Sequence, residues 1–418
     1  MRMENKLNDL TICVIGLGYV GFPLALAFSK HFNVVGFDSS SKKIDELKPY
    51  NSETFSIRND DSGICEADIN VIAVPTPVDR HKDPDLGCIL SAAQSIGKNL
   101  KKGCTVVLES SVYPGTTEEI VVPEIEKFGW KCGLDFKVGY SPERINPGDP
   151  EHGVDKITKL VSGQDDETTS LLKYVYSKVC QRVHVTRNIK TAEAAKIIEN
   201  TQRDINIALC NELSMIFARM GIHSDEVLDA AATKWNFARY SPGLVGGHCI
   251  PVDPYYLVYK ARELGYHSQV ILAGREINDS MPQYVAQQAI RLINDRSRLI
   301  KGSKVLIMGL TYKENVPDIR ETPSKEIIKE LSEYGVDIFA HDPLVDDIPG
   351  QFGVKPVSDI RALSGLDCVI ITVKHSNFNP YTLADMKAIM KPGPVLVDVR
   401  GLFPREEARN EGFSYFSL

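Results

Sequence analysis

The residue whose surroundings point most directly to chemistry is Cys249, which lies in the run Gly246-Gly247-His248-Cys249. A thiolate adds readily to an aldehyde and forms a covalent thiohemiacetal. A free thiol has a pKa of about 8.5 and needs help to ionise, and glycines let backbone N–H groups approach the sulfur closely. Most cysteines are inert core residues. We interpret the other eight cysteines in that way and predict Cys249 to be a nucleophile.

A second group of polar residues has helical spacing. Lys196, Asn200 and Arg203 stand at i, i+4 and i+7 in a segment, 189–220, that contains neither proline nor glycine. The segment predicts one long helix ended by Gly221, with the three side chains on one face. A solvated face is the alternative, but asparagine lowers helix propensity and favours a polar site. The apolar positions predict a buried side against another domain or subunit: Ile197, Ile205, Leu209, Leu213 and Ile216.

A glycine-rich turn near the N-terminus indicates a dinucleotide site. Residues 16–21 have the pattern Gly-x-Gly-x-x-Gly between a predicted strand over 10–16 and a predicted helix over 22–28, and a second strand follows over 33–38. Such a turn brings backbone N–H groups to a pyrophosphate at the helix N-terminus. Asp38 ends the second strand, where it would bind the adenosine ribose and repel a 2′-phosphate, so NAD is the predicted cofactor. The predicted cofactor contacts here are Gly16, Gly18, Tyr19, Val20, Gly21 and Asp38, with Lys43 either at the adenosine end or merely solvated.

Polar loops follow two further predicted strands of the N-terminal part, over 69–75 and 105–111. The carboxyl ends of the strands in an open parallel sheet face the ligand crevice. Thr76 and Ser111 are therefore candidate cofactor contacts, and the alternative is that their hydroxyls only cap turns.

The C-terminal third repeats the N-terminal pattern. Predicted strands over 304–309, 337–342, 367–373 and 391–398 echo those over 10–16, 33–38, 68–74 and 102–109. The repeat predicts an α/β fold with two Rossmann-like, doubly wound parallel-sheet domains joined by a central helical domain. The copy lacks the glycine fingerprint, so we expect a different ligand there. Lys313, Arg320 and Lys325 favour an anionic one, and two nucleotide-type domains suggest a nucleotide-linked substrate.

The length of the chain predicts how many domains carry these motifs. A chain of 418 residues is expected to form two or three domains. We predict an NAD-binding domain over 1–188, a central helical domain over 189–298 that carries the Cys249 loop, and a C-terminal nucleotide-sugar domain over 299–418.

Charge and cysteine usage exclude several classes of protein. A net charge of −7 without a basic stripe argues against nucleic-acid binding. No apolar run is long enough to cross a bilayer, and no signal core precedes the first predicted strand. Nine cysteines without a Cys-x-x-Cys pair predict reduced thiols in the cytoplasm and no metal site.

Taken in order, the motifs resemble the UDP-glucose/GDP-mannose dehydrogenase family. Six runs spread over almost the whole chain carry the resemblance: Gly-Leu-Gly-Tyr-Val-Gly at 16–21, Val-Pro-Thr-Pro at 74–77, Ser-Pro-Glu-Arg-Ile-Asn-Pro-Gly at 141–148, Glu-Ala-Ala-Lys-Ile-Ile-Glu-Asn at 193–200, Gly-Gly-His-Cys-Ile-Pro at 246–251 and Lys-Glu-Asn-Val-Pro-Asp-Ile-Arg-Glu-Thr at 313–322. The runs at 200–209 and 233–237 resemble the branch that acts on UDP-N-acetylhexosamines such as UDP-GlcNAc or UDP-GalNAc. UDP-glucose enzymes usually have an aromatic residue and a lysine where this chain has His248 and Val252.

The resemblance implies an NAD-dependent, four-electron oxidation of the sugar C6 to a carboxylate for surface-polysaccharide synthesis, by a homodimer. It implies that Cys249 carries the thiohemiacetal and thioester and that Lys196 stabilises the oxyanions. It also implies that Asp253 orients water or balances the lysine, and that Glu143 takes part in thioester hydrolysis. Ser111 stands for the threonine of a Ser-Thr motif. The implied substrate contacts are Arg144, Lys196, Asn200, Arg203, Gly247, Lys313 and Arg320.

Several alternatives remain open at this point. Asp253 could be a turn residue between two prolines, and His248 is expected to be a structural loop residue. The substrate could instead be UDP-N-acetylmannosamine or UDP-glucose. Related enzymes with a helix lysine and no cysteine remove only two electrons, and a nucleotide sensor would catalyse nothing.

Overall fold

The computed structural model describes residues 9–144, 153, 155–348 and 350–418. The chain forms two compact units, Met1–Asn200 with Val252–His267, and Thr201–Pro251 with Ser268–Leu418. The central helical residues are thus shared between the two units, and the three-domain division at 188/189 and 298/299 stays a prediction. No helix in the described part of the chain combines the length and the apolar character that a membrane span requires.

The first unit is built on a sheet in the order β3-β2-β1-β4-β5-β6-β7-β8. Neighbouring strands are parallel except β6 and β7, which run antiparallel. The strands are β1 (Thr11–Ile15), β2 (Asn33–Phe37), β3 (Phe55–Arg58), β4 (Ile69–Ile72), β5 (Thr105–Leu108), β6 (Lys137–Tyr140), β7 (Thr158–Gly163) and β8 (Arg182–Val185).

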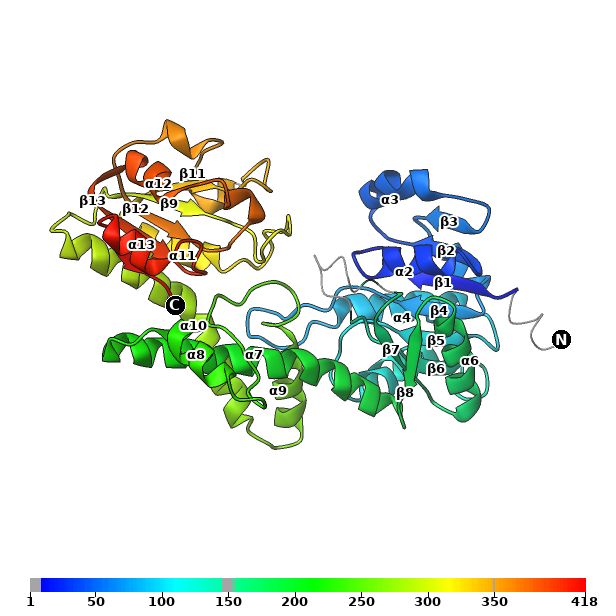
Figure 1. Cartoon of the computed structure of the whole chain (residues 1–418). Helices are drawn as coiled ribbons and strands as arrows, with labels where there is room; N and C mark the ends of the chain where they lie inside the picture. Colours follow the sequence, from blue (N-terminus) through cyan, green and yellow to red (C-terminus); the bar gives the residue numbers. More distant parts are fainter. Residues whose placement is uncertain (1–8, 145–152, 154, 349) are drawn as a thin grey trace. The chain divides into compact units, whose positions relative to one another are not determined.

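Helices cover both faces of this sheet (Figure 1). Alternate residues of β1 enter opposite cores: Cys13 and Ile15 pack with α4 and the start of α7, while Ile12 and Val14 pack with α2 and α6. The helices are α2 (Gly21–Phe28), α3 (Ser41–Leu47), α4 (Gly87–Asn99), α5 (Val122–Glu126), α6 (Asp166–Ser177), α7 (Ile189–Met220, shared with the second unit) and α9 (Asp253–Glu263), with short turns η1 (Lys48–Tyr50), η2 (Asp61–Cys65) and η3 (Thr117–Val121).

The second unit contains an all-parallel sheet in the order β11-β10-β9-β12-β13-β14. Its strands are β9 (Lys304–Met308), β10 (Asp337–His341), β11 (Lys355–Pro356), β12 (Leu366–Ile371), β13 (Met390–Asp398) and β14 (Ser414–Phe416). Helices α10 (Gln269–Asp295) and α11 (Ser324–Glu333) cover one face, and α12 (Leu383–Ile389) and α13 (Arg405–Asn410) the other (Figure 1). The unit also holds α8 (Ser224–Ala232) and the turns η4 (Gly350–Phe352), η5 (Ile360–Ala362) and η6 (Ser376–Phe378).

The predicted internal repeat is confirmed by matching backbone geometry. Gly16 and Gly309, each directly after the first strand of its sheet, both have φ of +94°. The Gly16 N–H donates to Phe37 O at 2.8 Å, and the Gly309 N–H donates to His341 O at 2.9 Å. Both halves therefore turn from their first strand in the same way, and the predicted α/β class with two doubly wound sheets is correct.

Helix α7 has the predicted bounds, and local chemistry explains them. The Asn188 side chain accepts a hydrogen bond from Thr191 N at 2.9 Å and caps the first turn. At the other end Gly221 has φ of +72°, and Ile222 N donates back to Phe217 O at 2.9 Å. This is the glycine-terminated ending that a left-handed residue allows.

The predicted apolar side of α7 is only partly buried within one chain, and its burial against another subunit stays a prediction. Ile197 is buried, but Leu209 and Ile216 are exposed by 52% and 43%. The positions of α7 that are buried in the second unit are largely polar instead. Asp204 pairs with Arg275 of α10, and Asn211 donates to Asn278 Oδ1 at 2.8 Å. Helical periodicity identified the apolar stripe correctly, but α10 packs against a different, hydrogen-bonded face of the helix.

Candidate functional site

The glycine turn after β1 has the shape that a dinucleotide requires. A Cβ on Gly16 would lie 2.8 Å from Ala73 O, and one on Gly21 would lie 1.9 Å from Gly16 O, so neither position tolerates a side chain. Gly18 instead faces open space, with no atom within 4 Å of its Cβ position. The turn is therefore tight where the protein packs and open where a pyrophosphate approaches the N-terminus of α2. These residues fit NAD.

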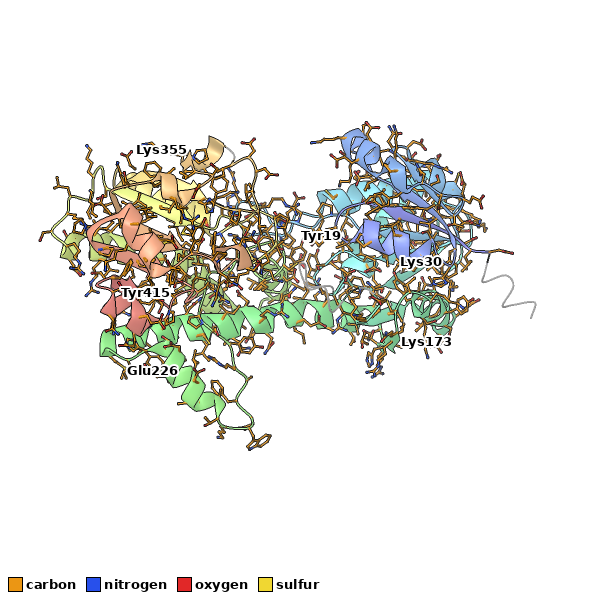
Figure 2. The ribbon with its side chains drawn as sticks, turned by 45° about the horizontal axis from the view of Figure 1, so that its top comes forward. Tyr19, Lys30, Lys173, Glu226, Lys355 and Tyr415 are labelled. Atoms are coloured by element: carbon orange, nitrogen blue, oxygen red, sulfur yellow. The ribbon has the colours of Figure 1, made fainter. Side chains whose placement is uncertain are left out.

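Asp38, directly after β2, is fixed beside the same turn. Its carboxylate accepts hydrogen bonds from Leu17 N at 2.9 Å, Ser40 N at 3.0 Å and Lys43 Nζ at 3.1 Å. The ammonium of Lys43 thus pairs with Asp38, and the assignment of Lys43 to the adenosine end stays a prediction. Tyr19 is exposed on the turn (Figure 2), and Val20 packs against the core that includes Leu24.

Thr76 and Ser111 lie at the carboxyl edge of the first sheet, where the fold places ligand contacts. Both are half-buried and follow β4 and β5. The Ser110 hydroxyl donates to Val74 O at 2.6 Å and ties the two loops together, and Tyr256 of α9 donates to Pro77 O at 3.3 Å. Their assignment as cofactor contacts stays a prediction.

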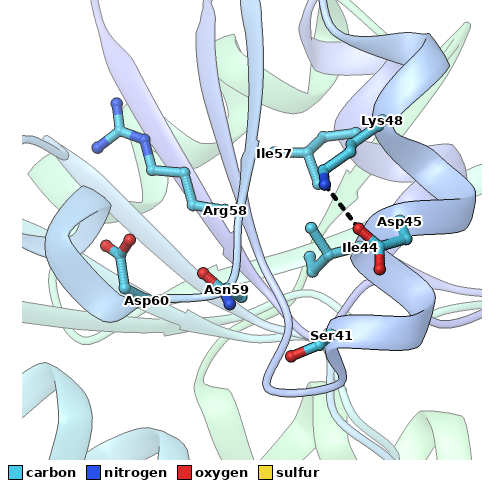
Figure 3. A pocket seen from close by; sticks show the side chains of 8 residues that line it. All are labelled: Ser41, Ile44, Asp45, Lys48, Ile57, Arg58, Asn59 and Asp60. Carbon is cyan, nitrogen blue, oxygen red and sulfur yellow. Dashed lines mark hydrogen bonds and ion pairs between the residues drawn. The ribbon is translucent and has the colours of Figure 1, made fainter.

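A pocket of about 270 Å³ lies between α3 and the end of β3 (Figure 3). Lys48 and Asp45, which are paired at 2.6 Å, line one side, and Arg58, Asn59 and Asp60 line the other. None of the predicted cofactor residues lines this pocket, so it does not alter the assignment of the glycine turn.

Three residues of the predicted catalytic group form a buried polar cluster in the first unit. The Asn200 Nδ2 atom donates to Asp253 Oδ2 at 2.6 Å. Lys196, Asn200 and Asp253 are each less than a tenth exposed, so a solvated helix face does not describe the first two. Burial raises the pKa of Asp253 to about 6, although the Lys196 charge and the Asn200 hydrogen bond lower it. Arg203 does not share this environment, because it is exposed.

The Ser-Pro-Glu motif reaches the same helix through Arg144. The Arg144 Nη2 atom lies 2.7 Å from Glu199 Oε1 of α7, and the Arg144 N–H donates to Glu143 Oε1 at 2.5 Å. Glu143 itself is buried. The structure therefore brings Glu143 and Arg144 to the helix that carries Lys196 and Asn200. The remainder of the motif, residues 145–148, lies outside the described residues.

A buried ion cluster beside Glu143 was not predicted from the sequence. Lys159 of β7 places its Nζ atom 2.6 Å from Glu109 Oε2 and 3.8 Å from Glu143 Oε2. Lys159 and Glu109 are almost completely inaccessible. One signal was present, since a lysine inside the apolar run Lys159-Leu160-Val161 is unusual for a strand buried on both faces.

The loop of Cys249 packs tightly within the second unit. Gly247 has φ of +86°, and its N–H donates to Glu321 O at 3.0 Å. A Cβ on Gly247 would lie 2.6 Å from the Tyr312 ring, and one on Gly246 would lie 2.5 Å from Pro323 Cδ. Only glycine fits at Gly247, where both the left-handed backbone and the ring exclude a side chain. Cys249 is half-buried at the end of this loop.

Two charged residues beside this loop pair with each other. Arg320 is exposed and holds Asp318 at 2.6 Å, and Asp318 lies 4.0 Å from His248 Nε2. Burial lowers the pKa of His248, and the Arg320 charge lowers it further. A neutral imidazole agrees with the expected structural role of His248. Lys313 is half-buried, and its role in substrate binding, like that of Arg320, stays a prediction.

The second Rossmann-like sheet differs from the first at its ribose-type aspartate. Asp342 occupies the position of Asp38 and accepts a hydrogen bond from Leu310 N at 2.6 Å. The ring of His375, completely buried, places Nε2 3.3 Å from Asp342 Oδ2. The Asn315 N–H donates to His375 Nδ1 at 2.9 Å, and the His375 Nε2 atom also lies 3.1 Å from Thr311 Oγ1. The Asp342 carboxylate is thus paired with a buried histidine, whereas that of Asp38 is paired with Lys43.

The chain matches three family models in sequence order. They are the NAD-binding domain, over residues 10–59 and 50–180, the central domain, over 190–280, and the UDP-binding domain, over 306–405, of the UDP-glucose/GDP-mannose dehydrogenase family. The three matches cover most of the chain, and the third covers most of the second Rossmann-like sheet.

Similar proteins agree with these matches over their full length. A UDP-N-acetyl-D-glucosamine 6-dehydrogenase of Pseudomonas aeruginosa is 45% identical over 96% of this chain and 99% of its own length. A protein of the same name from Salmonella typhi is 43% identical over 96% and 98%. Among solved structures, the UDP-N-acetyl-mannosamine dehydrogenase Cap5O of Staphylococcus aureus matches with a TM-score of 0.82 and 30% identity, covering 97% of this chain and 98% of that one.

Proposed function

Because this chain belongs to the UDP-glucose/GDP-mannose dehydrogenase family, we propose that it oxidises C6 of a UDP-N-acetylhexosamine to the uronate through a thioester on Cys249. The chain is an NAD-dependent nucleotide-sugar dehydrogenase. One observation carries the four-electron outcome: a half-buried cysteine ends a loop whose glycine backbone leaves no room for substitution. A two-electron enzyme or a nucleotide sensor would not need that nucleophile.

The first oxidation turns the C6 alcohol into an aldehyde. The chemistry supplied by bound NAD is the acceptance of a hydride in each of the two oxidations. The Lys196 ammonium stabilises the alkoxide from which the hydride leaves, in a site where burial strengthens electrostatic interactions. Asp253 balances the lysine charge, and Asn200 holds that carboxylate in place by a hydrogen bond.

The second oxidation takes place on Cys249. Its thiolate adds to the aldehyde carbon, and loss of a hydride from the thiohemiacetal leaves a thioester. Water then attacks the thioester carbon, and Glu143 accepts the water proton. As the carbon–sulfur bond breaks, the sulfur leaves with the electron pair, so that the uronic acid and a Cys249 thiolate are formed, and the acid then loses its proton to solvent to give the uronate.

For the sugar we propose UDP-GlcNAc, with UDP-GalNAc as its epimer at C4. Two relatives named for UDP-N-acetyl-D-glucosamine are 45% and 43% identical to this chain. A relative named UDP-N-acetyl-D-mannosamine dehydrogenase, from Methanocaldococcus jannaschii, is 31% identical over the whole chain. His248 and Val252, which depart from the usual UDP-glucose pattern, support the same choice. The product would serve as a precursor of a surface polysaccharide.

We also propose that the enzyme works as a cytoplasmic homodimer. None of the nine cysteines, all of which the structure describes, forms a disulfide, which suits a reducing compartment. On α7, Leu209, Ile216 and Met220 stand at i, i+7 and i+11 and are all exposed. Apolar residues repeated at this spacing form a continuous stripe along a helix, and a second copy of the helix would cover it.

The test is a panel of UDP-GlcNAc, UDP-GalNAc, UDP-ManNAc and UDP-glucose with NAD. It follows NADH by absorbance and the product by mass. We expect two NADH per sugar and the highest kcat/KM for UDP-GlcNAc. One NADH per sugar contradicts the thioester route, and preferred turnover of UDP-glucose contradicts the substrate assignment. Cys249→Ser should abolish uronate formation, whereas Cys65→Ser, at an exposed cysteine, should change nothing.

A further inference from the structure

The stretch of chain that leads to Cys249 is held by the side chain of one buried asparagine. The Gly243 N–H donates to Asn211 Oδ1 at 2.8 Å, and Asn211 Nδ2 donates to Gly243 O at 3.0 Å. Gly243 lies six residues before Cys249, and both Asn211 and Gly243 are buried. One side chain on α7 thus supplies a partner for both backbone polar groups of this glycine.

The loop has no regular structure that could supply these partners. Residues 241–246 form neither a helix nor a strand, and buried N–H and C=O groups outside such elements need side chains or water. Gly243 also has little room to move, because a Cβ there would lie 2.9 Å from Arg400 Nη1. The start of the loop is therefore fixed at Gly243, and its end is fixed where the Gly247 N–H donates to Glu321 O at 3.0 Å.

Asn211 itself is fixed by a buried polar network that reaches into α10. Its Nδ2 atom also donates to Asn278 Oδ1 at 2.8 Å. Asn278 Nδ2 in turn donates to Asp204 O at 2.9 Å and to Asp204 Oδ1 at 2.8 Å, and the Asp204 carboxylate pairs with Arg275. All four side chains are at most 2% exposed. If Asn211 turned away from Gly243, buried polar groups would lose their partners, so the network holds Asn211 in this one orientation.

We propose that Asn211, held by Asn278, is a positioning residue that fixes Gly243 and thereby places Cys249 for its attack on the aldehyde. The inference rests on the proposed role of Cys249 as the nucleophile. The step is unchanged: the sulfur bonds to the aldehyde carbon, the carbonyl electron pair moves to the oxygen, and a hydride then leaves the same carbon for NAD. Asn211 takes no part in these bonds, and it determines where the sulfur stands when they form.

Loss of Asn211 should therefore slow the second oxidation and spare the first. Asn211→Ala leaves the buried N–H and C=O of Gly243 without partners, so the loop shifts to bring them to water. A misplacement of about 1 Å slows a reaction step by about 100-fold. The first oxidation takes a hydride from the C6 alcohol and does not use the sulfur. A role in stability alone would instead reduce both oxidations in the same proportion.

Stopped-flow kinetics can observe the two oxidations separately. The full-length enzyme is mixed with UDP-GlcNAc and excess NAD, the two NADH are followed in turn, and semicarbazide traps any aldehyde that escapes for detection by mass. We expect Asn211→Ala to keep the rate of the first NADH, to slow the second by about 100-fold and to release aldehyde. The matched control is Asn206→Ala on the same helix, whose amide donates to Gln202 O at 2.6 Å. Both rates should stay at the wild-type values in this control.

Amide hydrogen exchange tests the contact with Gly243 without any turnover. Exchange is followed by mass in the peptide that contains residues 241–249, with no substrate present. Asn211→Ala should make the Gly243 N–H exchange about tenfold faster, the effect of losing one hydrogen bond. Asn278→Ala should act in the same direction because it releases Asn211. The double variant should match Asn211→Ala, since both substitutions act through one contact.

Faster exchange at Gly243 together with a selectively slowed second oxidation supports the inference. Unchanged exchange, or an unchanged ratio of the two oxidation rates, overturns it, and so does a double variant in which the two effects add. If Asn211→Ala does not fold, Asn278→Ala decides alone by its exchange and its ratio of rates. Failure of the proposed function looks different, because wild type itself would then give one NADH per sugar or no adduct on Cys249.

Discussion

Asn200 and Asp253 lie 53 positions apart in the chain, yet the amide of one donates to the carboxylate of the other at 2.6 Å. Asn200 is on α7 and Asp253 is the first residue of α9. The carboxylate is completely enclosed, and the Lys196 charge acts on it as well. The polar face predicted for α7 is therefore organised around an acid that begins a different helix.

Removing the Asn200 amide should move the acidic limb of turnover. The hydrogen bond favours the ionised form of Asp253, so Asn200→Ala should raise the pKa of Asp253 further above about 6. We expect the acidic limb of kcat to move to higher pH by on the order of one unit. Asn206→Ala on the same helix, whose amide donates only to a backbone carbonyl, is the control. An unmoved limb would show that the amide does not act through Asp253.

A methyl group on Gly247 should displace the nucleophile loop. Gly247→Ala combines a left-handed backbone with a Cβ only 2.6 Å from the Tyr312 ring. We expect kcat to fall by about 100-fold, the loss that a misplacement of about 1 Å produces. Gly221→Ala has a similar φ of +72° but no atom within 4 Å, so it should cost about 1–2 kcal/mol of stability and leave kcat unchanged. Equal kcat losses in the two variants would show that backbone strain alone is responsible.

Weakening the charge at Asp38 should relax the choice of cofactor. Asp38→Asn keeps an oxygen to accept the Leu17 N–H but no longer repels a 2′-phosphate, and it leaves the Lys43 ammonium without its carboxylate. We expect the ratio of kcat/KM for NAD to that for NADP to fall by about tenfold, or about 1.4 kcal/mol. Steady-state kinetics with both cofactors measure this ratio. A constant ratio would mean that Asp38 does not face the ribose.

Glu193 should make stability depend on pH. It is fully buried and accepts hydrogen bonds from Gly115 N at 2.6 Å and Thr117 N at 2.9 Å, and burial raises its pKa from 4.5 to about 7. Its stabilising contribution is therefore present below pH 4.5 and is lost as the pH rises through about 7. Glu193→Gln should gain up to about 3 kcal/mol relative to wild type between pH 5 and pH 8. Urea titrations at both pH values measure the gain, and exposed Glu212→Gln should show none.

Charges on the exposed stripe of α7 should separate the proposed dimer. Leu209→Glu or Ile216→Glu would place a carboxylate in an apolar contact between subunits. We expect sedimentation to show a dimer for wild type and a monomer for either variant. Leu134→Glu, at a more exposed leucine outside this helix, should remain a dimer. A wild-type monomer, or variants that stay dimeric, would remove the stripe from consideration as the interface.

Local sequence patterns predicted most of the fold. The bounds of α7 are right because Asn188, Gly221 and an uninterrupted run of helix formers act within a few residues of one another. The Rossmann turn and the repeat are right because glycine spacing and strand order are local signals as well. Lys196 and Asn200 were placed correctly on one face by helical periodicity alone.

Local sequence patterns do not identify which distant segments come into contact. Lys159 meets Glu109 only because β5, β6 and β7 are neighbours, with the last running antiparallel, and no local pattern fixes that order. The buried pair of Asp204 and Arg275 looked like two ordinary helix-surface charges. His375 was missed because its partner, Asp342, lies 33 residues earlier and follows a different strand.

The packing of the Cys249 loop against the C-terminal domain limits which chimeras can be made between members of this family. The loop packs closely against the segment 312–323: the Gly247 N–H donates to the Glu321 carbonyl, and the two glycines lie against the Tyr312 ring and Pro323. Arg400 adds a hydrogen bond to Pro242 O at 3.4 Å. A chimera that exchanges the C-terminal domain to change nucleotide preference would also exchange the surface that shapes the nucleophile. Residues 242–251 must therefore be transplanted with the C-terminal domain, even though they belong to the central region of the chain.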